Sequence, residues 1–219
     1  EIVLITRFAF PPEADGIHDW TTMQLLQRLS FSRGNVYGEV ANYTYRRWES
    51  YPLSVFIPDG VSDNGAVDYD DEIRAAMDFW NTTFGREIFL ETPDEEAARI
   101  ACTYEMWPPN NILAGRMKLV PQTSPDDNWG INVPVRAELF LNHDVLHIPE
   151  VTQKIARHEL AHALGCYDHT WDTGGMMSIS GGSPVPLDYE VRFLRALMGL
   201  PNLLRMDHYE GSFPDLPTY

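Results

Sequence analysis

Residues 158–169 read His-Glu-Leu-Ala-His-Ala-Leu-Gly-Cys-Tyr-Asp-His. Two histidines four positions apart on an α-helix lie on one face, about 6 Å apart along the axis. Both imidazoles can then reach one zinc ion at about 2.0–2.1 Å. Glu159 lies about 100° around the helix, where its carboxylate can reach a water bound to that metal. The spacing therefore predicts one zinc ion at His158 and His162, with Glu159 as general base.

The segment that carries these residues is expected to be a buried helix. Proline suits the first helical turn and glycine a helix end, so the helix is predicted to run from Pro149 to about Leu164 and to stop at Gly165. Val151 and Ile155 share the histidine stripe, and small or apolar residues form a stripe opposite. A helix that is apolar on both sides lies in the centre of a domain.

A bare His-Glu-x-x-His motif occurs by chance, and two core histidines can simply be hydrogen-bonded. Three further features favour a metal site. Gly165 follows His162 by three positions, Asp168 and His169 come directly after the turn, and Met176-Met177 follow in a glycine-rich segment.

The pattern H-E-L-A-H-A-L-G-x-x-D, followed by a downstream methionine, resembles that of the metzincin clan of zinc peptidases. In that clan the glycine lets the chain turn back so that a third ligand reaches zinc, and the methionine forms a turn beneath the metal. The resemblance implies an α+β, metzincin-like zincin domain with a mixed twisted sheet, a long backing helix, a central zinc-binding helix and a C-terminal helix. The resemblance covers about residues 52–200. Outside the zinc segment it depends only on the order of the predicted strands and helices.

Asp168 stands where most metzincins place a histidine, and His169 follows it. An Asp-His pair at this point is similar to the snapalysin family of small neutral proteases, in which the aspartate is the ligand. We expect Asp168 to be the third ligand, with His169 as the alternative, and the other residue to hydrogen bond the ligand shell. The methionine of the Met-turn also has two candidates. Met176 lies eight residues after Asp168, and Met177 lies eight residues after His169.

The remaining hydrophobic patterning predicts strands and helices along most of the chain. Strands are expected at Ile2–Ile5, Leu53–Ile57, Glu87–Leu90, Arg99–Tyr104, Met117–Val120 and Ala137–Leu141, and further helices at Trp20–Leu29, Asp70–Phe84 and Tyr189–Met198. This order is an α+β layout with a mixed sheet. Residues 1–50 are interpreted as an N-terminal extension packed on a catalytic domain of residues 51–219. The region around Asp15 loosely resembles inhibitory propeptide segments of some metzincins, which makes inhibition the alternative to a bracing role.

Composition limits the partners. The net charge of −16 argues against binding nucleic acid through a basic face. It leaves carboxylates for Ca²⁺, although nothing else in the sequence supports a calcium site. No apolar run approaches about 18 residues, so no membrane-spanning helix is expected. Cys102 and Cys166 can form a disulfide or remain thiols, and two glycosylation triplets slightly favour a secreted or extracytoplasmic protein.

The expected function is a zinc-dependent endopeptidase that hydrolyses peptide bonds with a metal-activated water and Glu159 as general base. A protein or peptide substrate would lie along an edge strand at Ala114–Val120, with the S1′ wall from Ser178–Pro186, and we expect a monomer. One alternative is a non-catalytic zinc-binding module on the same fold. The other is a different zinc peptidase clan with a glutamate ligand on a later helix, for which Glu190 is the candidate.

Overall fold

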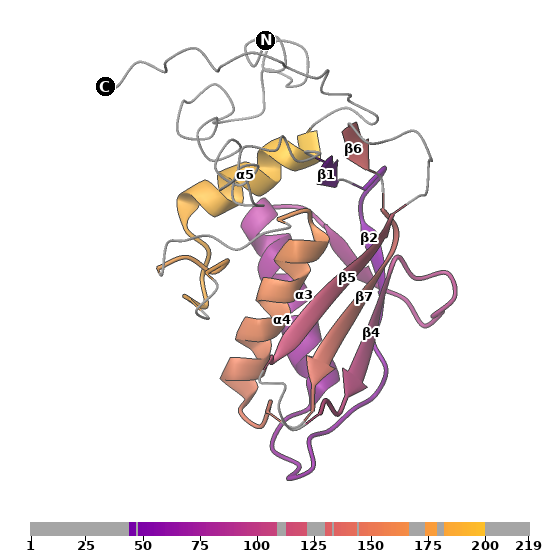
Figure 1. Ribbon diagram of the computed structural model, residues 1–219, viewed down its shortest axis with the longest axis vertical. Coiled ribbons are helices and arrows are strands. Elements are labelled where there is room, and N and C mark those ends of the chain that lie inside the picture. The colour runs from indigo at the N-terminus through magenta and orange to yellow at the C-terminus, as the bar shows by residue number, and fades with distance from the viewer. Residues whose placement is uncertain are drawn as a thin grey trace.

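The computed structural model describes residues 44–46, 48–108, 113–121, 130–132, 134–143, 145–166, 174–178 and 182–199. Within these residues the chain forms a five-stranded mixed sheet, a two-stranded sheet and three helices (Figure 1). This mixed sheet with helices is compatible with the α+β class predicted from the sequence. The strand expected at Ile2–Ile5 and the helix expected at Trp20–Leu29 lie outside the described residues.

The five-stranded sheet has the order β3-β2-β4-β7-β5. Its strands are β2 (Leu53–Phe56), β3 (Phe89–Glu91), β4 (Ile100–Glu105), β5 (Gly115–Pro121) and β7 (Pro134–Asn142). The pairs among β3, β2, β4 and β7 are parallel, whereas β5 is antiparallel to β7, with Gly115 opposite Leu141. Strand β5 is thus an edge strand of opposite direction to the rest, and it includes most of the segment predicted for that position.

Helix α3 spans Tyr69–Phe84, one residue longer than predicted. One face is buried because apolar side chains recur at helical spacing, at Tyr69, Ile73, Ala76, Met77 and Trp80. Asp68 is the N-cap, and Gly85, with a φ of 67°, ends the helix in a conformation that a Cβ atom disfavours.

Helix α4 spans Pro149–Ala163 and begins, as predicted, at the proline. Its end is a Schellman motif: Gly165 N–H donates to His162 O at 3.0 Å, and Cys166 N–H donates to Ala161 O at 3.1 Å. Gly165 has a φ of 111°, which explains why glycine stands at this position. The chain therefore turns sharply one residue after the last helical turn, as expected.

Helices α3 and α4 lie side by side over one face of the five-stranded sheet, and α4 also contacts β5 and β7 (Figure 1). Trp80 Nε1 of α3 donates to Arg157 O of α4 at 3.0 Å, which fixes the two helices against each other. Helix α5 (Asp188–Gly199) lies near the ends of both, where Arg195 donates to Thr83 O of α3 at 3.0 Å. Helix α4 thus packs against α3, β5 and β7. The burial predicted for both of its sides is met only in part, because Val151 of the histidine stripe is 41% exposed.

A second sheet pairs β1 (Thr44–Arg46) with β6 (Gly130–Asn132) in parallel. The sequence analysis predicted neither strand. Just after β1, Trp48 is 2% exposed and donates from Nε1 to Ala163 O at the end of α4, at 2.7 Å. Trp48 therefore packs on the C-terminal end of α4. No helix within the described ranges has the length and apolarity that a bilayer crossing requires.

Candidate metal centre

The structure brings His158 and His162 together on one face of α4. Their Nε2 atoms are 3.1 Å apart, and the two rings stand nearly perpendicular, at 86°, with centroids 4.7 Å apart. The i, i+4 spacing accounts for this, since side chains at that separation lie one above the other on a helix. The two imidazoles therefore point their outer nitrogens at one position.

Each histidine is oriented by a main-chain carbonyl. His158 Nδ1 contacts Met176 O at 2.8 Å, and His162 Nδ1 contacts Cys166 O at 2.5 Å. A carbonyl oxygen can only accept a hydrogen bond, so both Nδ1 atoms carry a proton. In the neutral imidazole the Nε2 atom then carries a lone pair, which is the form that ligates metals.

Two Nε2 lone pairs that face each other repel unless a cation lies between them. That cation is either a metal ion or a proton shared by the two rings. Nitrogens that bind a tetrahedral zinc ion at about 2.0–2.1 Å lie about 3.3 Å apart, close to the 3.1 Å between His158 and His162. The donor set and its spacing thus fit zinc.

Glu159 lies beside this pair with its carboxyl group enclosed between α4 and the edge strand. It is 5% exposed, and Oε2 has no hydrogen-bond partner among the described residues. A Cβ atom at Gly115 of β5 would lie 2.8 Å from Glu159 Oε1 and 2.7 Å from Ile155 Cγ2. The carboxyl group fits against β5 only because position 115 has no side chain.

Burial raises the pKa of Glu159 to about 8, and a backbone hydrogen bond from Met117 only partly opposes this rise. A carboxyl group of this kind exchanges protons near neutral pH in the metal-free chain. A nearby cation would lower its pKa, because it stabilises the carboxylate. The arrangement can therefore accept and return a proton next to the histidine pair.

The two methionines of the predicted Met-turn are buried in the segment 174–178. The carbonyl of Met176 is the acceptor for His158, so the turn lies directly against the first histidine. The following loop folds back onto the turn, because Ser183 N–H donates to Gly175 O at 3.2 Å. Of the expected S1′ wall, the structure describes Ser178 and residues 182–186.

Asp168 and His169, the two candidates for the third ligand, lie in residues 167–173, outside the described part of the chain. The choice between them stays a prediction.

Glu190 of α5 is placed differently from a metal ligand. Its carboxylate is 2% exposed and accepts main-chain hydrogen bonds from Met176 at 3.0 Å, Met177 at 2.9 Å and Leu187 at 2.7 Å. These bonds engage both oxygens, so the geometry gives no support to Glu190 as a later glutamate ligand. The sequence analysis missed this anchoring role, because Leu187, three residues before Glu190, lacks the Ser or Thr side chain that marks a capping box in a sequence.

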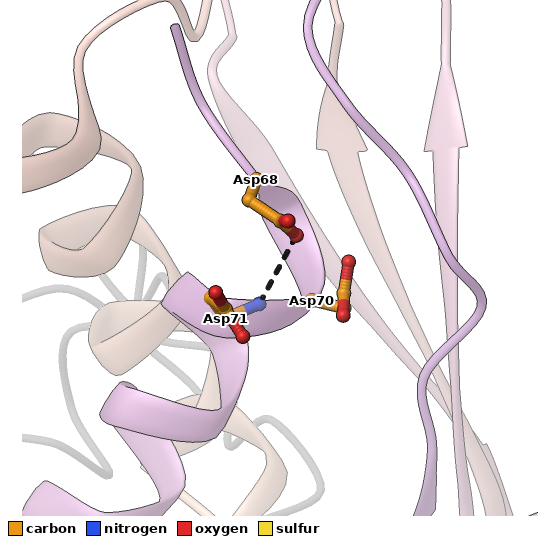
Figure 2. A group of neighbouring side chains, drawn as sticks. All are labelled: Asp68, Asp70 and Asp71. Atoms are coloured by element: carbon orange, nitrogen blue, oxygen red, sulfur yellow. Dashed lines mark hydrogen bonds between the residues drawn. The ribbon is translucent and has the colours of Figure 1, made fainter. Parts of the chain in front are cut away.

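Three aspartates gather at the start of α3, with carboxylate oxygens within 4.8 Å of one another (Figure 2). Asp68 accepts from the Asp71 amide at 3.5 Å, as an N-cap does. The pKa of Asp68 is raised, first by a hydrogen bond with Asp70 and then by burial. Arg74 contacts Asp70 at 2.5 Å and Asp71 at 3.2 Å, so a side chain of the same helix supplies positive charge. Helix capping and this ion pair explain the cluster, and we assign no Ca²⁺ to it.

Cys102 and Cys166 are both buried and are not joined, so the disulfide that the sequence allowed is not formed. Burial raises the pKa of the Cys102 thiol, which makes it unreactive.

Comparison of the chain with protein-family models and with curated protein sequences finds no match.

Proposed function

We propose that this protein is a zinc-dependent endopeptidase with a metzincin-like domain. The observation that carries the proposal is the pair of Nε2 atoms of His158 and His162, 3.1 Å apart with both Nδ1 protons directed to carbonyls. The buried carboxyl group of Glu159 beside them supplies the second requirement, a base. The sharp turn at Gly165 and the methionine turn against His158 agree with the same proposal.

His158 and His162 would hold the metal, with Asp168 or His169 as the third ligand. When bound, zinc polarises a carbonyl group and lowers the pKa of a water molecule. Three protein ligands leave one position open, as a catalytic site requires.

Glu159 would act on the proton. It would take one from the attacking water and later deliver it to the nitrogen of the leaving amine, so the carboxylate would be regenerated in each cycle. Its burial favours this role, because a carboxylate that is poorly solvated holds a proton more readily than an exposed one. A purely structural metal site would not need such a group, which argues against the non-catalytic alternative.

The edge strand offers a place for an extended peptide. Asn142 N–H donates to Ala114 O, so the main-chain groups of Ala114 face β7. Because these groups alternate along an antiparallel pair, those of Gly115, Met117 and Leu119 face away from the sheet. The Met117 amide bonds the Glu159 carboxylate, which brings the base to this outer edge. A peptide added as a further strand would then lie next to the base.

The test is hydrolysis of an unfolded protein such as casein, with added zinc and with a chelator. The wild-type chain should cleave it, the chelator should stop cleavage, and Glu159→Gln should keep zinc while losing about 10²–10⁴-fold in rate. Glu72→Gln makes the same chemical change on α3, where Glu72 accepts from Gln153 at 3.2 Å, and should leave the rate unchanged. A Glu159→Gln variant with more than about a tenth of wild-type activity would refute the general-base role.

A further inference from the structure

We infer that Glu190 is a positioning residue for His158, and that its negative charge reaches the imidazole through the single peptide group that joins Met176 to Met177. The inference rests on the proposed metal site, because its consequence is the strength with which His158 binds zinc.

The two ends of that peptide group have different partners. Its N–H, which belongs to Met177, donates to Glu190 Oε1 at 2.9 Å. Its C=O, which belongs to Met176, accepts from His158 Nδ1 at 2.8 Å. Carboxylate, peptide and imidazole therefore form one continuous chain of hydrogen bonds that ends at His158 Nε2.

The carboxylate is held rigidly at the start of this chain. Oε2 accepts from Met176 N–H at 3.0 Å and from Leu187 N–H at 2.7 Å, and the side chain is almost fully buried. A Cβ atom at Gly175 would lie 2.5 Å from Oε1, so the glycine is needed for the carboxylate to approach the turn.

Hydrogen bonds in series polarise one another. A carboxylate that accepts from the N–H of a peptide makes its carbonyl a stronger acceptor, and the stronger bond to Nδ1–H leaves Nε2 more electron-rich. Groups that bond a ligating histidine in this way raise its basicity, and their loss typically lowers metal affinity about 10–100-fold. Glu190 would thus act on His158 as a carboxylate acts in a direct carboxylate–histidine pair, with one peptide group interposed.

His162 serves as an internal reference. Its Nδ1 proton goes to Cys166 O, whereas Glu190 accepts hydrogen bonds from the amides of Met176, Met177 and Leu187. Loss of the Glu190 charge should therefore affect His158 more than His162.

The experiment compares wild type, Glu190→Gln and Glu72→Gln by two readouts, the zinc dissociation constant and the imidazole ¹⁵N chemical shifts of the zinc-loaded chains. Glu190→Gln should weaken zinc binding about 10–100-fold and shift the His158 resonances more than those of His162. Glu72→Gln should match wild type. Unchanged zinc affinity in Glu190→Gln, or equal shifts of both histidines, would overturn the inference.

A measurement on the wild-type chain covers the case in which Glu190→Gln does not fold. Zinc loading should move the Met177 amide proton further than that of Met176. Both amides bond Glu190, but only the Met177 N–H belongs to the peptide that contacts His158. Equal movement overturns the relay alone. A wild-type chain that binds no zinc overturns the proposed function, and the relay with it.

Discussion

Glu159 is a carboxyl group held where its charged form is poorly solvated, and this has a consequence for stability. Burial raises its pKa to about 8 in the folded chain, whereas an unfolded chain returns it to its ordinary 4.5. Between these two values the folded state binds more protons than the unfolded state. The free energy of unfolding of the metal-free protein should therefore fall as pH rises from about 4.5 to 8, by a few kcal/mol at most.

Urea unfolding of the zinc-free chain at several pH values measures this dependence. The Glu159→Gln variant has no group to titrate at this position, so its free energy of unfolding should change less with pH than that of wild type. The difference between the two curves isolates Glu159 from other carboxyl groups such as Glu72, whose pKa burial also raises. Parallel curves would show that Glu159 ionises normally in the folded chain.

Gly115 is expected to determine where the Glu159 carboxylate lies. In Gly115→Ala the new Cβ would lie 2.8 Å from Oε1 and 2.7 Å from Ile155 Cγ2, so the carboxylate must shift. Because small displacements of a catalytic group can lower rates by about 10²-fold, kcat should fall tenfold or more while zinc affinity is retained.

Gly65→Ala is the matched control for this change. Gly65 has a φ of 67° and no atom within 4 Å of its Cβ position, so its substitution should lower stability by about 1 kcal/mol without changing kcat. If Gly115→Ala and Gly65→Ala have the same kcat, the glycine of the edge strand has no role in placing the base.

For individual residues, the sequence predicts only the roles that follow from spacing along one element. His158, Glu159 and His162 could be identified because one helix carries all three. The roles of Gly115 and Glu190 could not be identified, because they depend on contacts between elements far apart in the chain. The raised pKa of Glu159 could not be predicted either, because it depends on the burial of the carboxyl group against strand β5.

Among the elements, α4 depends at its C-terminal end on a residue from outside the predicted catalytic domain. Trp48 Nε1 donates to Ala163 O, one of the carbonyls that a helix end leaves unpaired. Trp48→Phe keeps an aromatic ring but removes this donor and some volume. The free energy of unfolding should fall by about 1–3 kcal/mol.

Trp107→Phe is the control for that substitution, since Trp107 Nε1 bonds the Glu105 carboxylate at 2.9 Å outside the core. When both variants are unfolded in urea, Trp107→Phe should lower the free energy of unfolding by less than about 1 kcal/mol. Equal stability of the two variants would show that Trp48 does not support α4.

The helices α3, α4 and α5 were predicted to within a residue or so at each end, because their apolar periodicity and their end signals agree. The strands Leu53–Phe56 and Ile100–Glu105 were also located, each with small boundary differences. The short strands β1 and β6 were missed, since each is only three residues long and is defined by its partner rather than by its own sequence pattern.

For the whole molecule, the mixed sheet was predictable but the strand order β3-β2-β4-β7-β5 was not. Local patterning shows which segments are strands, whereas their order depends on how α3 and α4 cover one face. That order places β5 at the edge beside α4, and so brings Glu159 of the helix to the strand at which we propose that a peptide binds. The proposed function therefore depends on the complete packing of the domain as well as on the histidine motif.

X-ray absorption at the zinc edge of the loaded protein identifies the atoms bound to the metal, and so tests whether His158 and His162 hold a zinc ion. We expect one zinc ion with at least two imidazole nitrogens at about 2.0–2.1 Å, and loss of imidazole scattering in His158→Ala and His162→Ala. A spectrum with oxygen ligands alone, as the aspartates at the start of α3 would give, or one unchanged by both substitutions, would contradict this expectation.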